Sequence, residues 1–206
     1  MRTLAIDSAT EACSVALIED GAVVAGDLLM LGRGHAEQLV PMIAALPGKG
    51  RADRIAVSRG PGSFTGVRVG LAAARALAFA WQAELVGYRA LALVAAMARA
   101  QGGARPVFVA MAGGHGEWFC EGFDADGRAI QPCASLRPDA ALRAAGAEMV
   151  AGNRAEELVS LRGSGIALPL WPDARSLALL PPDALGTDCS PLYGRPPDAT
   201  LAKAAP

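Results

Sequence analysis

The chain has 206 residues, enough for one domain or two small ones with a sizeable hydrophobic core. Its 19 Lys and Arg residues nearly balance its 20 Asp and Glu residues, and the net charge is −1. A protein that wraps nucleic acid or coats an acidic membrane by itself needs a basic surface, so this balance argues against both. None of the 4 cysteines belongs to a C-x-x-C pair, which favours reduced thiols over a disulfide framework or a zinc site.

The first residues contain no positively charged segment followed by a long apolar core and a cleavage site. We therefore expect no signal peptide and a cytoplasmic protein. The alanine-rich region 67–98 is apolar, but Arg75, Glu84 and Arg89 interrupt it before it is long enough to span a bilayer. No membrane association is expected.

The front of the chain predicts three strands, at residues 2–6, 13–19 and 23–29, in an antiparallel meander. Asp7, Ser8 and Thr10 form a polar turn after the first strand. Asp7 either accepts backbone hydrogen bonds within this turn or lies near a phosphate or metal.

Residues 35–46 predict an amphipathic helix with a kink at Pro41. A metal site at His35 needs a second ligand one turn further on, but that position is Leu39. A capping or interface role is therefore favoured for His35.

Residues 54–81 predict a buried strand, a glycine-rich loop and a long helix. A helix N-terminus of this kind offers unpaired N–H groups to an anion. However, the loop contains no lysine and matches neither the Walker nor the dinucleotide pattern. Two interpretations stay open: the loop binds an anion, or it only turns the chain.

The helix after the loop is apolar on several sides, with Val67, Leu71, Ala74 and Ala78 at helical spacing. Such a helix must be covered on more than one side. Its own sheet and a second chain are equally compatible with the pattern.

The rest of the chain predicts a strand at 84–88 and a helix at 90–100, after which the pattern restarts. Strands are expected at 106–111, 117–124, 129–131 and 148–151, and helices at 138–145, 155–161 and 173–180. The tail 190–206 is expected to be loop-like and to fray after residue 197. The order β-β-β-α-β-α thus occurs twice, which suggests the duplicated fold of actin and sugar kinases, with lobes at 1–100 and 101–206.

Four stretches of the chain, AIDSATEACSVAL, HAEQLVPMI, AVSRGPGSFTGVRVGLAAARALA and SPLYGR, strongly resemble the TsaB family of the bacterial tRNA threonylcarbamoyladenosine pathway. This family is also called YeaZ or glycoprotease-like. The first three stretches match most of the N-terminal half. The resemblance implies an α/β actin-like (ASKHA, ribonuclease H-like) fold in two lobes.

The resemblance also implies a noncatalytic subunit that pairs with the catalytic paralogue TsaD and works with the ATPase TsaE. It implies contact with tRNA only through the complex, no metal or cofactor held by the chain itself, and an adenine nucleotide at a complex interface. Residues 89–93 contain no histidine where the catalytic relative carries its metal-binding pair.

In this family the two N-terminal helices form the pairing surface, which also makes a homodimer when the partner is absent. The corresponding residues here are His35, Glu37, Leu39, Met42, Ile43, Val67, Arg68, Leu71, Ala74, Arg75 and Ala78. Candidate nucleotide or phosphate contacts are Asp7, Ser8, Thr10, Gly60, Gly62, Ser63, Thr65 and Gly66. We expect Leu39→Glu or Leu71→Glu to abolish pairing and leave the fold intact.

Two other function classes are weighed against this one. An ATP-dependent phosphotransferase would use the same loop, but it needs a second acidic residue near the start of the second half, where residues 111–113 offer none. A peptidase is disfavoured because Ser63 is not in a G-x-S-x-G motif and only His35 and His115 are available as bases.

Overall fold

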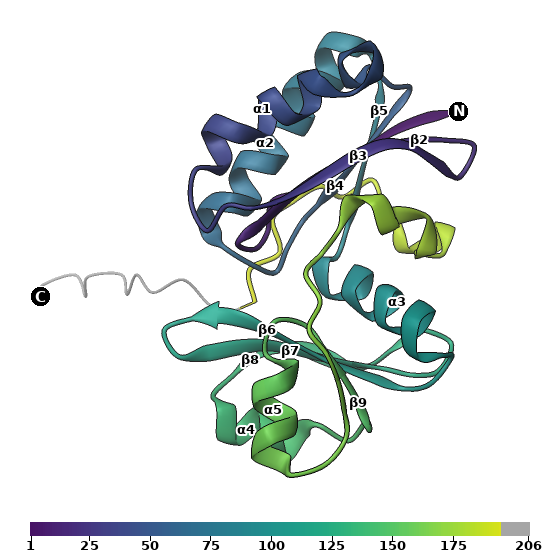
Figure 1. Cartoon of the computed structure of the whole chain (residues 1–206). Coiled ribbons are helices and arrows are strands. Elements are labelled where there is room, and N and C mark those ends of the chain that lie inside the picture. The colour runs from purple at the N-terminus through teal and green to yellow at the C-terminus, as the bar shows by residue number, and fades with distance from the viewer. Residues whose placement is uncertain (195–206) are drawn as a thin grey trace, which may run out of the picture.

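The structure, a computed structural model, describes residues 1–194, so the predicted fraying after residue 197 lies outside the described residues. These residues fold into two lobes, one above the other in Figure 1. The first lobe contains β1 (Arg2–Asp7), β2 (Ala12–Glu19), β3 (Ala22–Met30), α1 (His35–Ala45), η1 (Pro47–Gly50), β4 (Arg54–Ser58), α2 (Phe64–Trp81), β5 (Glu84–Tyr88) and α3 (Ala90–Gly102). The second contains β6 (Val107–Gly114), β7 (Glu117–Phe123), β8 (Ala129–Leu136), α4 (Pro138–Ala144), β9 (Met149–Ala151), α5 (Ala155–Arg162) and β10 (Ile166–Leu168).

The two lobes are built on the same sheet topology. Residues 1–194 form one five-stranded sheet in the order β3-β2-β1-β4-β5 and another in the order β10-β9-β6-β7-β8. Read from its other edge, the second order matches the first strand by strand. In the first sheet β1 pairs antiparallel with β2 and parallel with β4. In the second sheet β6 likewise pairs antiparallel with β7 and parallel with β9. The structure therefore confirms the duplicated two-lobed α/β fold.

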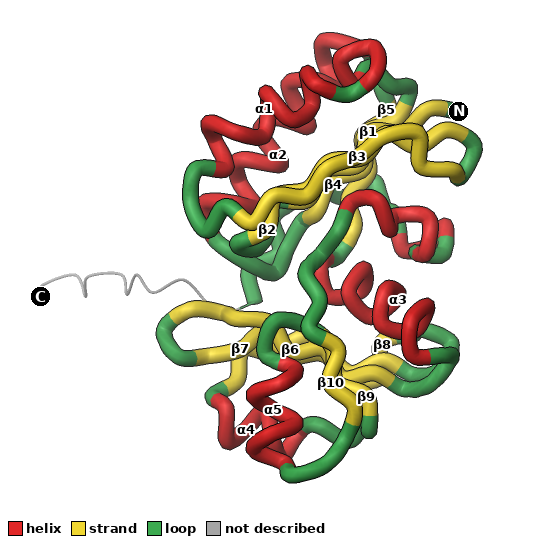
Figure 2. Tube along the Cα trace, in the orientation of Figure 1, coloured by secondary structure: helices red, strands yellow, loops and turns green. Residues whose placement is uncertain are grey.

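Helices and sheets alternate in layers (Figures 1 and 2). The pair α1 and α2 covers the outer face of the first sheet, and α4 and α5 cover the outer face of the second. Between the sheets, α3 contributes Leu91 and Val94 to one apolar cluster and Leu93 and Met97 to another. This all-round burial explains why the helix is apolar on every side.

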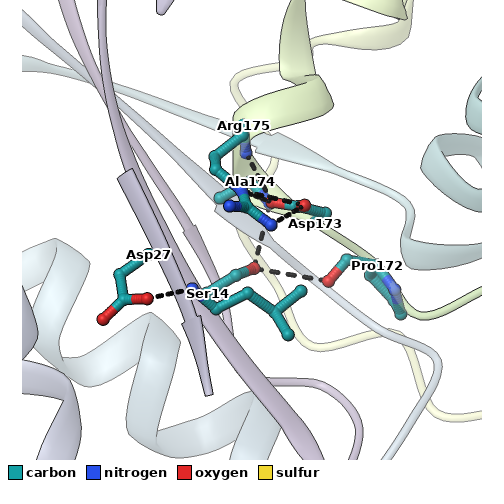
Figure 3. Close-up of polar contacts among 7 residues, drawn as sticks. Ser14, Asp27, Pro172, Asp173, Ala174 and Arg175 are labelled. Carbon is teal, nitrogen blue, oxygen red and sulfur yellow. Dashed lines mark hydrogen bonds and ion pairs between the residues drawn. The ribbon is translucent and has the colours of Figure 1, made fainter. Parts of the chain in front are cut away.

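The chain crosses back to the first lobe after β10. There η2 (Ala174–Leu179) lies against β2 on the face opposite α1 and α2. Figure 3 shows the polar contact that holds it: the buried Ser14 hydroxyl of β2 donates to the Pro172 carbonyl (3.3 Å) and accepts from the Ala174 amide (2.9 Å). The last elements before residue 194 are η3 (Pro182–Ala184) and an extended segment beside β5.

Two predicted elements need correction, and one strand was missed. The short strand expected at 129–131 runs on to Leu136, because Pro132 lies on the sheet's edge strand, where a missing N–H is tolerated. The helix expected at 173–180 is the 3-10 helix η2. The strand β10, which is partly exposed and follows a glycine-rich turn, was not predicted. No helix of residues 1–194 is long and apolar enough to cross a membrane.

Candidate functional site

The glycine loop at the start of α2 is filled by the turn that follows β1. The Ser63 amide donates to the Ala9 carbonyl (2.6 Å), and the Ser8 hydroxyl donates to the Gly66 carbonyl (2.8 Å). A Cβ added to Gly62 would overlap the carbonyl oxygen of Ala9, and one added to Gly66 would overlap that of Ser8. These glycines are therefore needed for the close approach of two backbone segments.

The same packing occupies part of the space at the start of α2 with the chain's own backbone. Carbonyl oxygens of the turn lie against the N-terminus of α2, where an anion would need N–H donors. The Gly66 amide already donates to the Ser63 side chain (3.3 Å), and the Val67 amide donates to the Ser63 carbonyl (2.9 Å). Thr65 is exposed on the helix, away from these contacts. The packing accounts for Gly62 and Gly66 without a ligand, and nucleotide binding at the candidate residues stays a prediction.

Asp7 is buried beneath Tyr88 and does not line an open site. Its carboxylate accepts from the Ala9 amide (2.9 Å) and the Tyr88 hydroxyl (3.1 Å). Burial raises the pKa of Asp7 to about 6, although these two hydrogen bonds act in the opposite direction. Burial, and then the adjacent Asp7 carboxylate, raise the pKa of Tyr88. Asp7 therefore takes the turn-holding role weighed for it, within a buried pair.

Thr10 and His35 hold the same turn from its other side. The Thr10 hydroxyl accepts from the Ala12 amide (3.2 Å), and His35 Nε2 donates to the Thr10 carbonyl (2.8 Å). His35 is buried at the first residue of α1. Its ring therefore ties α1 to the turn. Among residues 1–194, no three His, Cys, Asp or Glu side chains gather in a way that could hold a metal ion.

A pocket of about 170 Å³ opens between the lobes. It is lined by Arg59, Arg89, Cys133, Leu192, Tyr193 and Gly194. Arg89 makes an ion pair across the lobes with the fully buried Glu121, whose pKa is raised by burial. A second polar tie joins Glu11 to Asn153 of the other lobe (2.7 Å). The lobes are thus fixed to each other by side chains of this chain.

The Cys133 thiol at the pocket and the Ser63 hydroxyl are not activated as nucleophiles. Burial raises the pKa of the Cys133 thiol to about 11, so the thiol at the pocket is protonated at neutral pH. The Ser63 hydroxyl caps α2, and the His35 ring is engaged with Thr10. Nucleophilic catalysis needs a base within hydrogen-bond reach of the attacking atom, and the described residues supply none at Ser63.

The apolar residues predicted to contact a partner lie inside the first lobe. Leu39 is 1% exposed and Leu71 is 2% exposed, both packed against the sheet. The same holds for Met42, Ile43, Val67, Ala74 and Ala78. The expected result for Leu39→Glu and Leu71→Glu is corrected accordingly: both would place a charge in the core and unfold the lobe.

A different set of residues forms the outer surface of the two helices. On α2 it comprises Phe64, Arg68, Ala72, Arg75 and Phe79, which we call the α2 stripe. At about 100° per residue these five positions fall within an arc of about 80°. Phe79 is 90% exposed, and on the neighbouring α1 Val40 is 57% exposed beside exposed Glu37. The predicted residues Glu37, Arg68 and Arg75 therefore do lie on the surface.

Sequence reasoning missed Phe79, Val40 and the two pocket arginines. Phe79 and Val40 are single apolar residues on the outer faces of amphipathic helices, a signal that was present but was outweighed by the stronger core pattern. Arg59 and Arg89 each follow directly after a parallel strand, a position at which side chains from different strands converge.

The fold and these surfaces define a two-lobed actin-like α/β protein with a filled glycine loop. A solved ethanolamine utilization protein, EutJ from Carboxydothermus hydrogenoformans, shares the fold at a TM-score of 0.51 and 14% identity, covering 87% of this chain and 89% of that one. The family model described as TsaD, tRNA N6-adenosine threonylcarbamoyltransferase, matches residues 30–171.

Two relatives are closer in sequence. The solved structure of YeaZ from Pseudomonas aeruginosa aligns at a TM-score of 0.76 and 30% identity over 93% of this chain and 99% of that one. The tRNA threonylcarbamoyladenosine biosynthesis protein TsaB of Escherichia coli is 38% identical over 135 residues, which is 63% of this chain. The chain belongs to the TsaB family, also called YeaZ. The aligned region spans 58% of the length of the E. coli protein.

The filled loop predicts that Gly62→Ala is strongly destabilising. The new Cβ would meet the backbone of Ala9, which cannot rotate away, so we expect a loss of about 2 kcal/mol or more in the free energy of unfolding. Gly146→Ala is the matched control, because its Cβ would enter open space. Urea denaturation measures both variants, and equal stabilities would show that the turn does not sit in the loop.

The buried Asp7 carboxyl predicts a pH-dependent effect of Asp7→Asn. The folded chain binds the Asp7 proton more tightly than the unfolded chain, whose pKa is near 3.8, so stability falls as pH rises through the window from 3.8 to about 6. Asn lacks this titration, and its amide still has Tyr88 as a partner. The stability of Asp7→Asn relative to wild type should therefore rise by up to about 3 kcal/mol between acidic and neutral pH. A difference that stays constant across this range would contradict the raised pKa.

Proposed function

We propose that this chain is the noncatalytic partner subunit of the bacterial machinery that attaches threonylcarbamoyl to adenosine in tRNA. Support comes from its family and from the name of its E. coli relative, a tRNA threonylcarbamoyladenosine biosynthesis protein. In this proposal the chain pairs with a TsaD-type transferase, works with the ATPase TsaE, and contacts tRNA only within the complex. Without the transferase it forms a homodimer through the same surface.

The observation that carries the proposal is the exposed apolar surface of α1 and α2. A helix pair that covers its own sheet needs no large apolar side chain on its outer side, yet Phe79 and Val40 lie there among small alanines. Burying one such side chain in an interface contributes about 1.5–3 kcal/mol. A helix pair of the partner, packed against α1 and α2, would cover this surface.

A noncatalytic role is supported by the chemistry of the candidate reactive groups. Cys133 is a protonated thiol, Ser63 is a helix cap, and Asp7 is buried with Tyr88. The filled glycine loop likewise gives no reason to propose a phosphotransferase. An adenine nucleotide in the complex would therefore take its phosphate contacts chiefly from the partner.

Reconstitution tests the function directly. The chain is mixed with the TsaD-type transferase and TsaE of the same cell, ATP, threonylcarbamoyl-adenylate and unmodified tRNA. The modified nucleoside is then measured by mass spectrometry after digestion. We expect modification to depend on this chain, and full activity in its absence would refute the proposal.

The pairing surface is tested with Phe79→Glu, measured by size-exclusion chromatography with light scattering. We expect loss of both the heterodimer and the homodimer with an unchanged melting temperature, because Phe79 is 90% exposed and contributes little to the core. Leu161→Glu, at an exposed position of α5, is the control and should pair normally. Normal pairing of Phe79→Glu would exclude the outer face of α2 as the interface.

A further inference from the structure

The last described residues, 186–194, form a segment that we call the C-terminal strap. It begins beside β5, where Gly186 and Gly87 exchange two backbone hydrogen bonds (2.7 and 3.0 Å). Further on, the Leu192 amide donates to the Arg59 carbonyl (2.8 Å). The strap therefore extends along the edge of the first lobe and reaches the mouth of the pocket between the lobes.

Arginines of the first lobe hold the strap through its backbone and one carboxylate. Arg59 donates to Asp188 (2.5 Å) and to the Ser190 carbonyl (2.9 Å). Arg75 of the α2 stripe donates to the Cys189 carbonyl (2.8 Å). Three successive residues of the strap are thus anchored beside α2, which fixes the position of the residues that follow.

The strap ends in a cluster of Phe64, Arg68 and Tyr193. Arg68 donates through Nε and Nη2 to the Tyr193 hydroxyl (3.0 and 2.9 Å). Its guanidinium lies 3.4 Å from the centre of the Phe64 ring, and the two ring centres are 5.6 Å apart. The Tyr193 side chain of the strap is therefore joined to the N-terminal end of the α2 stripe.

The side chains of this cluster contact one another and are nevertheless exposed to solvent. Phe64 is 56% exposed and Tyr193 is 46% exposed. Because Phe64 belongs to the α2 stripe, the cluster is continuous with the surface around Phe79. Exposed Tyr and Arg side chains in a fixed arrangement are typical of residues that dominate the energy of protein interfaces.

The charge of the cluster indicates the chemistry of what covers it. Within residues 1–194 neither Arg68 nor Arg75 has a carboxylate at ion-pair distance, whereas the nearby Arg59 and Arg89 do. Arg68 also keeps N–H donors beyond the two used on Tyr193. A partner surface that carries carboxylates would satisfy both arginines.

We propose that the C-terminal strap is part of the partner-binding surface, with Phe64, Arg68 and Tyr193 anchoring a protein partner that presents carboxylates beside an apolar helix face. This inference rests on the proposed function, whose partner is the TsaD-type transferase, and adds a second element to the surface. The pairing surface consists of α1, α2 and the strap. The end of this surface formed by Phe64, Arg68 and Tyr193 recognises acidic side chains.

The test measures the affinity of the full-length chain for the TsaD-type transferase by titration calorimetry. Tyr193→Ala and Phe64→Ala should each weaken binding about tenfold or more, since each removes an aromatic anchor. Tyr193→Phe, which keeps the ring, should weaken it less. Arg68→Ala should also reduce the dependence of affinity on salt, because it removes a charge that contacts the partner.

Leu161→Ala is the matched control and should bind as wild type, and thermal melts check that each variant is folded. Binding within twofold of wild type for Tyr193→Ala and Phe64→Ala would overturn the inference. If Phe79→Glu fails to bind in the same experiment, the pairing surface of the proposed function still stands. If Tyr193→Ala and Phe64→Ala bind weakly while Phe79→Glu binds normally, the strap contacts the partner and the C-terminal part of the α2 stripe does not.

Discussion

The close contact between the turn after β1 and the glycine loop determines much of this structure. Gly62 and Gly66 allow carbonyl oxygens of Ala9 and Ser8 to lie directly against the first turn of α2. This contact fixes α2 against the sheet, and so decides which of its residues face the core and which form the α2 stripe. It also places backbone atoms of the turn where side chains at Gly62 and Gly66 would otherwise lie. One packing arrangement thus sets both the conformation of the loop and the outward face of α2.

The two lobes are joined in a way that does not depend on a ligand between them. Arg89 and Glu121 pair across the lobes, Glu11 and Asn153 do so at a second point, and α3 is packed between the two sheets. The buried Glu121 carboxylate would be costly to leave unpaired, and Arg89 of the other lobe supplies its ion pair. The two lobes are therefore held together by an ion pair, a hydrogen bond and shared apolar packing, all from this chain.

Most of the fold could be predicted from the sequence because its strands and helices have clear periodicity and glycine or proline boundaries. The candidate site was harder to predict, for a physical reason. The apolar residues of α2 give the strongest pattern, but a pattern cannot tell which neighbour they face, and Leu71 and Val67 face the sheet. The surface residues Phe79 and Tyr193 give no periodic signal. The sequence predicted the glycine-rich loop, but it could not show that the chain's own backbone lies against Gly62 and Gly66.

The return of the chain to the first lobe has a consequence for how the protein is made. Ser14 receives its partners from Pro172 and Ala174, and η2 covers buried residues of β1 and β2 such as Ala5 and Ala16. α3 covers part of this face of the sheet early, but the part that η2 covers stays open until almost the whole chain has been synthesised. Contacts between residues so distant in sequence form late. The apolar packing of the first lobe is thus completed by some of the last residues to be synthesised.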